Sequence, residues 1–186
     1  KENAPIDAPK AASILRNRKG VGEAELGLAN EMAINQFIAH HSVIFQPEKK
    51  RMWVSTAPWQ CGKYVAYDLN RIFSDSIDFN HEIYTENLTV PADSFLQQQE
   101  YQQLMTYKRL APVLRKQIKK KERLDEQTLH AFQHANPHFF YVYELLGDYY
   151  HATGQQDKAL RNWKKALLLP IPKRSESERI EHKINN

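Results

Sequence analysis

The sequence is poor in the residues that build disulfide or metal scaffolds, because Cys61 is its single cysteine in 186 residues. One thiol excludes an internal disulfide and cannot assemble a zinc site by itself. No apolar run approaches the roughly 18 residues that a membrane-spanning helix needs, and no signal-peptide pattern is found. What the chain does have, 41% hydrophobic and 11% aromatic residues, is enough for a folded core.

The charge balance is only weakly basic. The 26 Lys and Arg residues exceed the 22 Asp and Glu residues, for a net charge of +4. The one dense basic run is residues 116–123. A solvated helix end stabilised by the helix dipole is one interpretation of this run, and a polyanion-binding site is the other. We favour the first and therefore expect no nucleic-acid partner.

Residues 1–10 contain two prolines and no hydrophobic periodicity, which predicts a linker or a disordered end. Because the chain opens with Lys1 rather than Met, we expect it to be a piece of a longer protein. The compartment is not fixed by the sequence. A location outside the cytoplasm of a bacterium would follow if the missing part carries a signal.

Residues 11–90 change period from helix to strand. We predict a short helix at 11–19, ended by glycines, and a second helix at 31–39 with Asn30 as its N-cap. Three runs rich in β-forming residues then predict an antiparallel meander with strands at 41–45, 51–55 and 63–67. A long connection, 70–91, follows.

Residues 91–186 are predicted to be helical throughout. Asp93 is expected to begin this region as a cap, and Pro112 either kinks the path or starts a new helix between 95–109 and 111–121. Asp125 should cap a helix at 126–135. Ser175 with Glu178 has the spacing of a capping box and predicts a last helix from 175 to about 183.

Within this half, residues 143–172 have the spacing of a tetratricopeptide-like repeat, two antiparallel helices that nest through alternating large and small residues. Gly147 and Ala159 are the expected close-approach positions, Tyr150 and Trp163 the side chains they receive, and Gly154 the left-handed turn. The full set of matching positions is Tyr143, Leu146, Gly147, Tyr150, Gly154, Ala159, Trp163 and Ala166.

Three groups of residues could carry chemistry. His41 and Ser42 are adjacent, but neighbours in a strand point to opposite faces and do not form a nucleophile and its base. His130 and His134 could share a metal on one helix, yet no third ligand pattern follows.

Cys61 beside Lys63 could be a reactive loop thiol or a half-buried structural cysteine. Trp53, Trp59, Tyr64 and Tyr67 could line a pocket or form the core of the sheet. We predict no catalytic, cofactor-binding or metal-binding residue in the chain.

Three stretches carry a family resemblance: 28–47, 52–55 and 62–69, the last reading Gly-Lys-Tyr-Val-Ala-Tyr-Asp-Leu. They resemble the C-terminal end of the catalytic domain in the acyl-coenzyme A:6-aminopenicillanic acid acyltransferase family, which is related to choloylglycine hydrolases and belongs to the N-terminal nucleophile hydrolases. The resemblance covers about residues 11–75. The helical end is consistent with members that carry a tetratricopeptide-like tail.

The resemblance implies a four-layer αββα fold and an acyltransferase or amide hydrolase. In such enzymes an N-terminal cysteine, exposed by self-cleavage, attacks the carbonyl while its own α-amine takes the proton. This chain begins with Lys1, so that nucleophile is absent and no catalytic residue can be carried over.

We therefore expect an α+β chain in three parts: 1–10, a linker; 11–90, the end of the hydrolase-like sheet with its flanking helix; and 91–186, a tetratricopeptide-like helical domain. The expected function is that of a C-terminal fragment of an amide hydrolase or acyltransferase, inactive alone. Its expected partner is the missing catalytic segment, which would complete a site for a small acylated amide, with self-association through an exposed sheet edge as a further expectation. The alternative is a non-enzymatic protein-interaction module.

Overall fold

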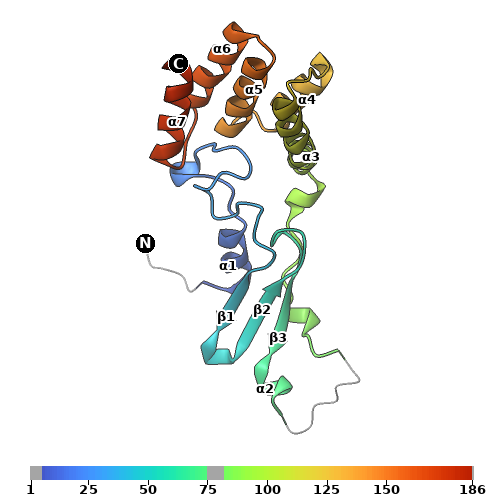
Figure 1. Cartoon of the computed structure of the whole chain (residues 1–186). Helices are drawn as coiled ribbons and strands as arrows, with labels where there is room; N and C mark the ends of the chain where they lie inside the picture. The colour runs from blue at the N-terminus through green and yellow to red at the C-terminus, as the bar shows by residue number, and fades with distance from the viewer. Residues whose placement is uncertain (1–5, 75–81, 186) are drawn as a thin grey trace. The chain divides into compact units, whose positions relative to one another are not determined.

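A computed structural model describes residues 6–74 and 82–185 (Figure 1). Across these residues the fold is α+β and mostly helical, with one three-stranded antiparallel sheet and seven α-helices. The chain forms two compact units. The sheet unit comprises residues 1–17 and 34–96, and the helical unit comprises residues 18–33 and 97–186.

The sheet has the predicted meander, with strands β1 (Val43–Gln46), β2 (Arg51–Ser55) and β3 (Tyr64–Asp68) in the order β1-β2-β3. Its register places Trp53 of β2 between Ile44 and Ala66. The β1–β2 hairpin turns through Pro47–Lys49 and ends at Lys50 in the left-handed conformation. The observed strands lie within two residues of those predicted.

Two short helices flank the sheet. Helix α1 (Ala8–Leu15) begins earlier than predicted, because Asp7 caps it by accepting a hydrogen bond from the Lys10 amide. Helix α2 (Leu69–Ile72) is capped by Asp68. It lies in the predicted long connection, of which residues 75–81 are outside the described residues.

The predicted helix at 31–39 is wrong, because these residues form turns and bends. The reason is local. Within the segment, the side chain of Asn35 accepts a hydrogen bond from the Phe37 amide, and such a local bond competes with helical backbone bonds. Phe37 itself has φ +54°, outside the helical region.

The helical unit contains helices α3 (Gln99–Lys120), α4 (Glu126–Ala135), α5 (Phe140–Ala152), α6 (Gln156–Leu167) and α7 (Arg174–Asn185). The bounds of α4 and its Asp125 cap are as predicted. Asp93 accepts a hydrogen bond from the Phe95 amide, but it begins only the short 3₁₀ helix Ser94–Gln97. The predicted helix start at 95 is wrong, because α3 starts at Gln99.

Two further helix predictions need correction. Of the two alternatives at Pro112, a new helix is wrong, because α3 continues through this residue. Pro112 is exposed, whereas Ala111 and Leu114 beside it are buried, so packing on the inner side offsets the lost backbone bond. Ser175 lies inside the first turn of α7, and Glu178 pairs with Arg174 instead of closing a capping box.

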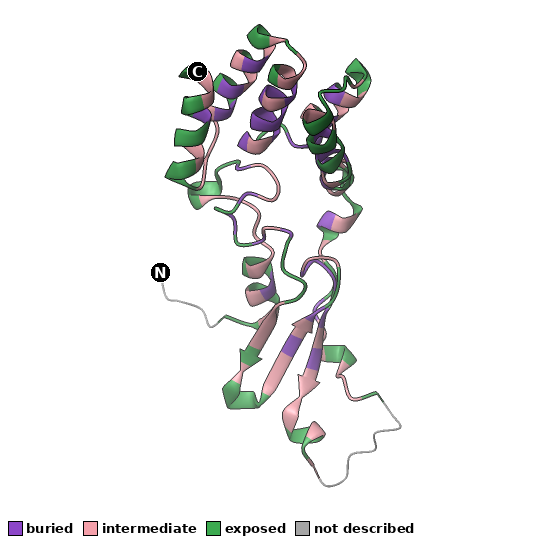
Figure 2. Cartoon of the chain, viewed as in Figure 1, coloured by how far each residue is buried: buried purple, intermediate pink, exposed green. Residues whose placement is uncertain are grey.

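The α5–α6 hairpin has two of its predicted features, the approach of Gly147 to Trp163 and the glycine turn. A Cβ atom at Gly147 would lie 2.3 Å from Cδ1 of Trp163, so only glycine permits this approach. Gly154 has φ +77° in the turn between the helices. Tyr150, predicted to be received in this packing, is only half-buried, whereas Tyr149 before it in α5 is buried. Figure 2 shows buried residues along most of α5.

Residues 18–33 are joined to the helices at the α4–α5 junction. The side chain of Asn136 accepts a hydrogen bond from the Leu28 amide at 2.8 Å and donates one to the Leu28 carbonyl at 2.6 Å. Gly27 packs against the backbone of Phe139, since a Cβ there would lie 2.5 Å from the Phe139 nitrogen. This irregular segment is therefore part of the helical unit.

Candidate functional site

One face of the sheet is covered by α1. Side chains alternate along each strand, and on this face Trp53, Tyr64 and Ala66 are at most 4% exposed. They form a small core with Ala12 of α1 and with Val90. This is the ordinary helix-on-sheet half of an α+β layer structure.

The opposite face is apolar but uncovered. We call it the open sheet face; its residues are Val43, Phe45, Met52, Val54, Val65 and Tyr67. Phe45 is 64% exposed, and the other five are half-buried. An antiparallel sheet whose second face meets water alternates apolar with polar side chains. The two apolar faces of this sheet are instead typical of an inner layer.

The two edges of the sheet differ. The outer edge of β3 is occupied, because Tyr64 exchanges two backbone hydrogen bonds with Val90 and the Ala66 carbonyl accepts one from the Thr85 amide. Next to β1, the Ser55 amide of β2 donates a hydrogen bond to the Ser42 carbonyl. This bond fixes which backbone N–H and C=O groups of β1 point toward β2. The backbone groups of Val43 and Phe45 therefore point outward. Within the described residues no hydrogen bond occupies them.

Arg16 fastens two loops to the end of α1. Its guanidinium donates hydrogen bonds to the carbonyls of Gly62 at 2.6 Å and Pro91 at 2.8 Å, and it lies 5.1 Å from the ring centre of Tyr64. A planar donor with five N–H groups suits such a junction of carbonyls. Arg16 thus organises the loop that contains Cys61. Sequence reasoning did not single out this arginine.

Cys61 is buried with no exposed surface. Its sulfur accepts a hydrogen bond from the amide of Asn35 at 3.3 Å. Lys63, proposed as its activator, is exposed and pairs with Glu86 at 3.7 Å. This placement favours the structural interpretation of the thiol over the reactive one, since reactive thiols need access.

The hydroxyl of Ser42 does not have a histidine base. It lies within hydrogen-bonding distance of the Tyr64 hydroxyl at 2.5 Å, and the Ser42 amide donates to Ser55 Oγ. His41 is exposed. Burial raises the pKa of Tyr64, and the hydrogen bond from Ser42 and the charge of Arg16 oppose that shift in part. Ser42, Ser55 and Tyr64 thus form a group of uncharged hydrogen-bonded side chains that stabilises this end of the sheet.

His130 and His134 are brought together, with ring centres 4.0 Å apart on α4. Both are exposed, and Glu126 pairs with Lys158 at 3.5 Å. In residues 6–74 and 82–185 no group of three or more potential metal ligands converges.

The four aromatic residues considered for a pocket lie apart. Trp53 and Tyr64 belong to the covered core, as the core interpretation predicts, and Tyr67 is on the open sheet face. Trp59 packs edge-to-face against Phe37, with ring centres 6.2 Å apart. The four therefore do not line one cavity.

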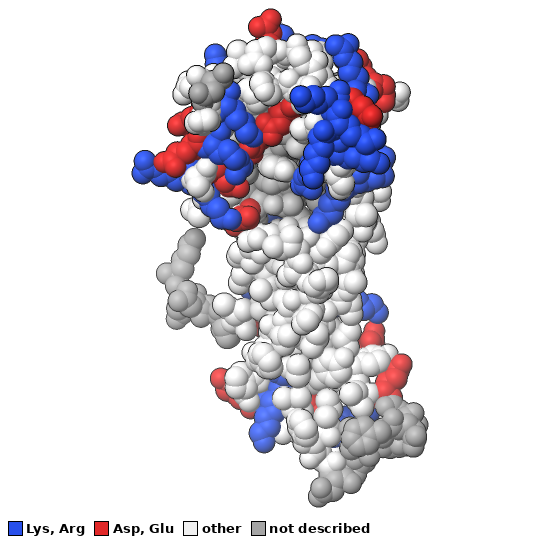
Figure 3. Space-filling view, viewed as in Figure 1, with Lys and Arg blue, Asp and Glu red and all other residues white. Residues whose placement is uncertain are grey.

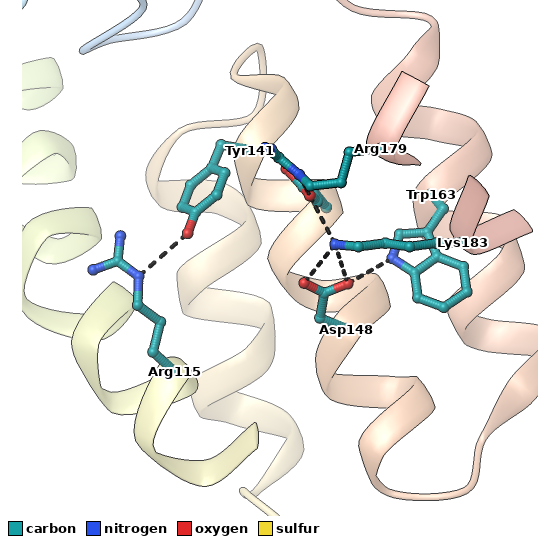
Figure 4. A network of polar contacts seen from close by, with 7 residues as sticks. Arg115, Tyr141, Asp148, Trp163, Arg179 and Lys183 are labelled. Carbon is teal, nitrogen blue, oxygen red and sulfur yellow. Dashed lines mark hydrogen bonds and ion pairs between the residues drawn. The ribbon is translucent and has the colours of Figure 1, made fainter. Parts of the chain in front are cut away.

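Figure 4 shows a polar network around Asp148, Lys183 and Trp163. This network in the helical unit includes a buried carboxylate that sequence reasoning missed. Glu144 of α5 has a side chain only 2% exposed. It accepts two hydrogen bonds from Arg179, each 2.8 Å long, and one from Lys183, so α7 is tied to α5. Its position among apolar residues of α5 was the available signal, since a buried Glu needs a partner.

The Glu144 network extends to a third helix, α6. Lys183 also contacts Asp148, whose carboxylate accepts a hydrogen bond from the indole of Trp163 at 3.0 Å. Burial raises the pKa of Glu144, but the hydrogen bonds from Arg179 and Lys183 outweigh it and hold that pKa below its ordinary value. Because two cations face two carboxylates, the charges balance. The network therefore acts as a structural link between the helices.

In the part of the chain that the structure describes, no helix has the length and apolar character to cross a lipid bilayer. No family model, curated protein or solved structure matches the chain.

Proposed function

We propose that this chain is the C-terminal part of an acyltransferase or amide hydrolase of the N-terminal nucleophile class, in which its strands extend one sheet of an αββα sandwich. The proposal starts from the resemblance of residues 28–47, 52–55 and 62–69 to that family. The chain alone has no nucleophile of the required kind, since Cys61 is buried and internal.

The open sheet face is the observation that carries the proposal. In an αββα sandwich each sheet has helices on one face and the other sheet on its second face, with the two sheets about 10 Å apart. The sheet here has α1 over one face and six apolar side chains on the other. That pattern supports an inner sheet that is completed by a second one.

The strand edges support the same arrangement. Residues 85–90 occupy the outer edge of β3, whereas the outward groups of Val43 and Phe45 leave β1 able to pair. We infer that the sheet continues beyond β1, with strands supplied by the catalytic segment. The Arg16 junction and α1 would then lie on the outer, helical side.

The test is enzymatic and uses the source protein with any segment encoded before Lys1. We expect release of acyl groups from small amide substrates, lost when a cysteine exposed by self-cleavage is changed to alanine. A second variant, Phe45→Lys, should disrupt assembly of the sandwich and abolish activity, whereas Leu168→Lys, at an 85% exposed position of the helical unit, should not. Full activity of the cysteine variant would refute the proposed mechanism.

A second candidate is a protein-interaction module, which the α5–α6 hairpin favours. Gly147 and Trp163 nest as in a tetratricopeptide-like repeat, and repeats of this kind stack to form binding surfaces. In this case no release of acyl groups is expected, even when a segment encoded before Lys1 is included. A soluble monomer that captures a peptide would support it.

A further inference from the structure

Helix α3 carries an unusual run of positive charge. Residues 101–121 include seven Lys or Arg residues and no Asp or Glu. Five of these cations are exposed within the helix, and we call them the α3 cationic face: Arg109, Arg115, Lys116, Lys119 and Lys120. Figure 3 shows Lys and Arg side chains gathered over this helix.

The five cations form one stripe. At 3.6 residues per turn they fall within about 140° of the helix circumference, and Arg109 and Lys120 are roughly 16 Å apart along the axis. The opposite side of α3, which includes Leu104, Tyr107 and Leu114, is buried in the helical unit. The stripe therefore faces away from the core along about three turns.

Stabilisation of the helix end does not account for the whole stripe. The helix dipole favours cations in the last turn, where Lys119 and Lys120 lie, and its effect falls off beyond that turn. Arg109 lies three turns earlier. The solvated-end interpretation therefore explains only the C-terminal part of the pattern.

Few carboxylates compensate this charge. Arg115 donates to the hydroxyl of Tyr141 at 3.3 Å, and Lys120 lies 3.6 Å from Glu122. Among the described residues, no carboxylate forms an ion pair with Arg109, Lys116 or Lys119. The five cations therefore repel one another, and an external anion bound along the stripe would relieve that repulsion.

We propose that the α3 cationic face adsorbs to a membrane surface rich in anionic lipid headgroups. Clusters of four to eight Lys and Arg residues on one helix are typical of such surfaces, with about 1 kcal/mol of attraction per cation. Met105 and Val113, which are 40% and 37% exposed, lie beside the cations and add apolar contact at the headgroup level.

The same residues argue against single-stranded nucleic acid as the occupant. Strand binding uses exposed aromatic side chains for base stacking, but the aromatic residues of α3 are half-buried Tyr101 and buried Tyr107. A straight row of cations on a packed helix matches a flat array of anions. Adsorption of this kind needs no spanning helix and does not depend on acyl chemistry.

Vesicle flotation of the 186-residue chain tests the proposal, with vesicles of phosphatidylcholine alone or with 30% phosphatidylserine. We expect flotation only with the anionic vesicles and its loss at 0.5 M salt, because exposed charges are screened. The variant Lys116→Gln with Lys120→Gln should partition about 25-fold less, from about 1 kcal/mol per cation. The matched control removes two exposed cations of α6, Arg161→Gln with Lys164→Gln.

Circular dichroism should show that both double variants are folded, since all four positions are exposed. The proposal is overturned if the chain floats equally with neutral vesicles, or if the α6 variant loses as much binding as the α3 variant. It is also overturned if a DNA duplex competes the chain off the vesicles at equimolar charge, because the stripe would then prefer nucleic acid. The proposal is supported if the α6 variant still floats with anionic vesicles and the α3 variant does not.

Discussion

At the scale of single residues, the α5–α6 hairpin depends on one missing methyl group. Gly147 is within a helix, where glycine ordinarily costs about 1 kcal/mol relative to alanine. It is retained at a position where Trp163 approaches its Cα so closely that a Cβ would lie 2.3 Å from the indole. The close packing of Trp163, and not a need for the backbone freedom of glycine, therefore explains the glycine at this position.

Changing Gly147 to alanine should therefore destabilise the helical unit. We expect a loss of about 1–3 kcal/mol in the free energy of unfolding, since overpacking outweighs the gain in helix propensity. Urea denaturation followed by circular dichroism measures it.

The double variant with Trp163→Leu supplies the control. Relief of the clash should make the Gly147→Ala change neutral or stabilising in that background. If the alanine costs the same beside leucine, contact with Trp163 is not its cause.

At the scale of elements, α7 is held to α5 by the Glu144 network. Glu144 is buried and its two cationic partners are partly exposed, with Arg179 at 46% and Lys183 at 25%. Removing one member of a fully buried pair costs about 3–5 kcal/mol. Solvent screening at the partly exposed partners reduces that cost.

We expect Glu144→Gln to lower the free energy of unfolding by about 1–3 kcal/mol at pH 7. Glu178→Gln is the matched control, because its pair with Arg174 on α7 is exposed; such a pair contributes about 0.5 kcal/mol or less. Equal losses from the two changes would mean that the buried network does not hold α7.

The same carboxylate should give stability a defined acid dependence. The pKa of Glu144 is lower in the folded chain than its ordinary value. Its contribution is thus complete above the unfolded-state pKa, about 4.3, and is lost as pH falls from there through the folded-state pKa. Wild type should lose more stability than Glu144→Gln over that range in parallel urea titrations.

How far the sequence predicts these elements depends on where their stabilisation comes from. The strands and α4 follow from local signals, which are runs of β-branched and aromatic residues and the Asp125 cap. The helix predicted at 31–39 fails because Asn35 accepts a bond from the Phe37 amide within the segment and Phe37 has φ +54°. Glu144 and Arg16 were missed because their partners are 35 or more residues away in sequence.

At the scale of the whole molecule, the chain has an apolar surface that ordinary soluble domains cover. The open sheet face exposes Phe45 beside an unoccupied β1 edge within the described residues. Exposed apolar strands with free edges pair with other chains. The isolated chain should therefore associate with itself at micromolar to millimolar concentration.

Sedimentation velocity measures that association. Phe45→Lys should shift the 186-residue chain toward monomer with little change in its melting temperature, because the side chain is 64% exposed. Leu168→Lys removes an isolated exposed apolar residue and should leave the association unchanged. A wild-type chain that stays monomeric at all concentrations would argue against the open face as an interior surface.

One carboxylate described above links three helices at once. Asp148 lies on α5, receives the indole N–H of Trp163 from α6, and contacts the ammonium group of Lys183 from α7. Loss of α7 would therefore alter the electric field at the indole as well as the packing around it. Trp163 thus serves as an intrinsic optical reporter of whether the last helix is docked.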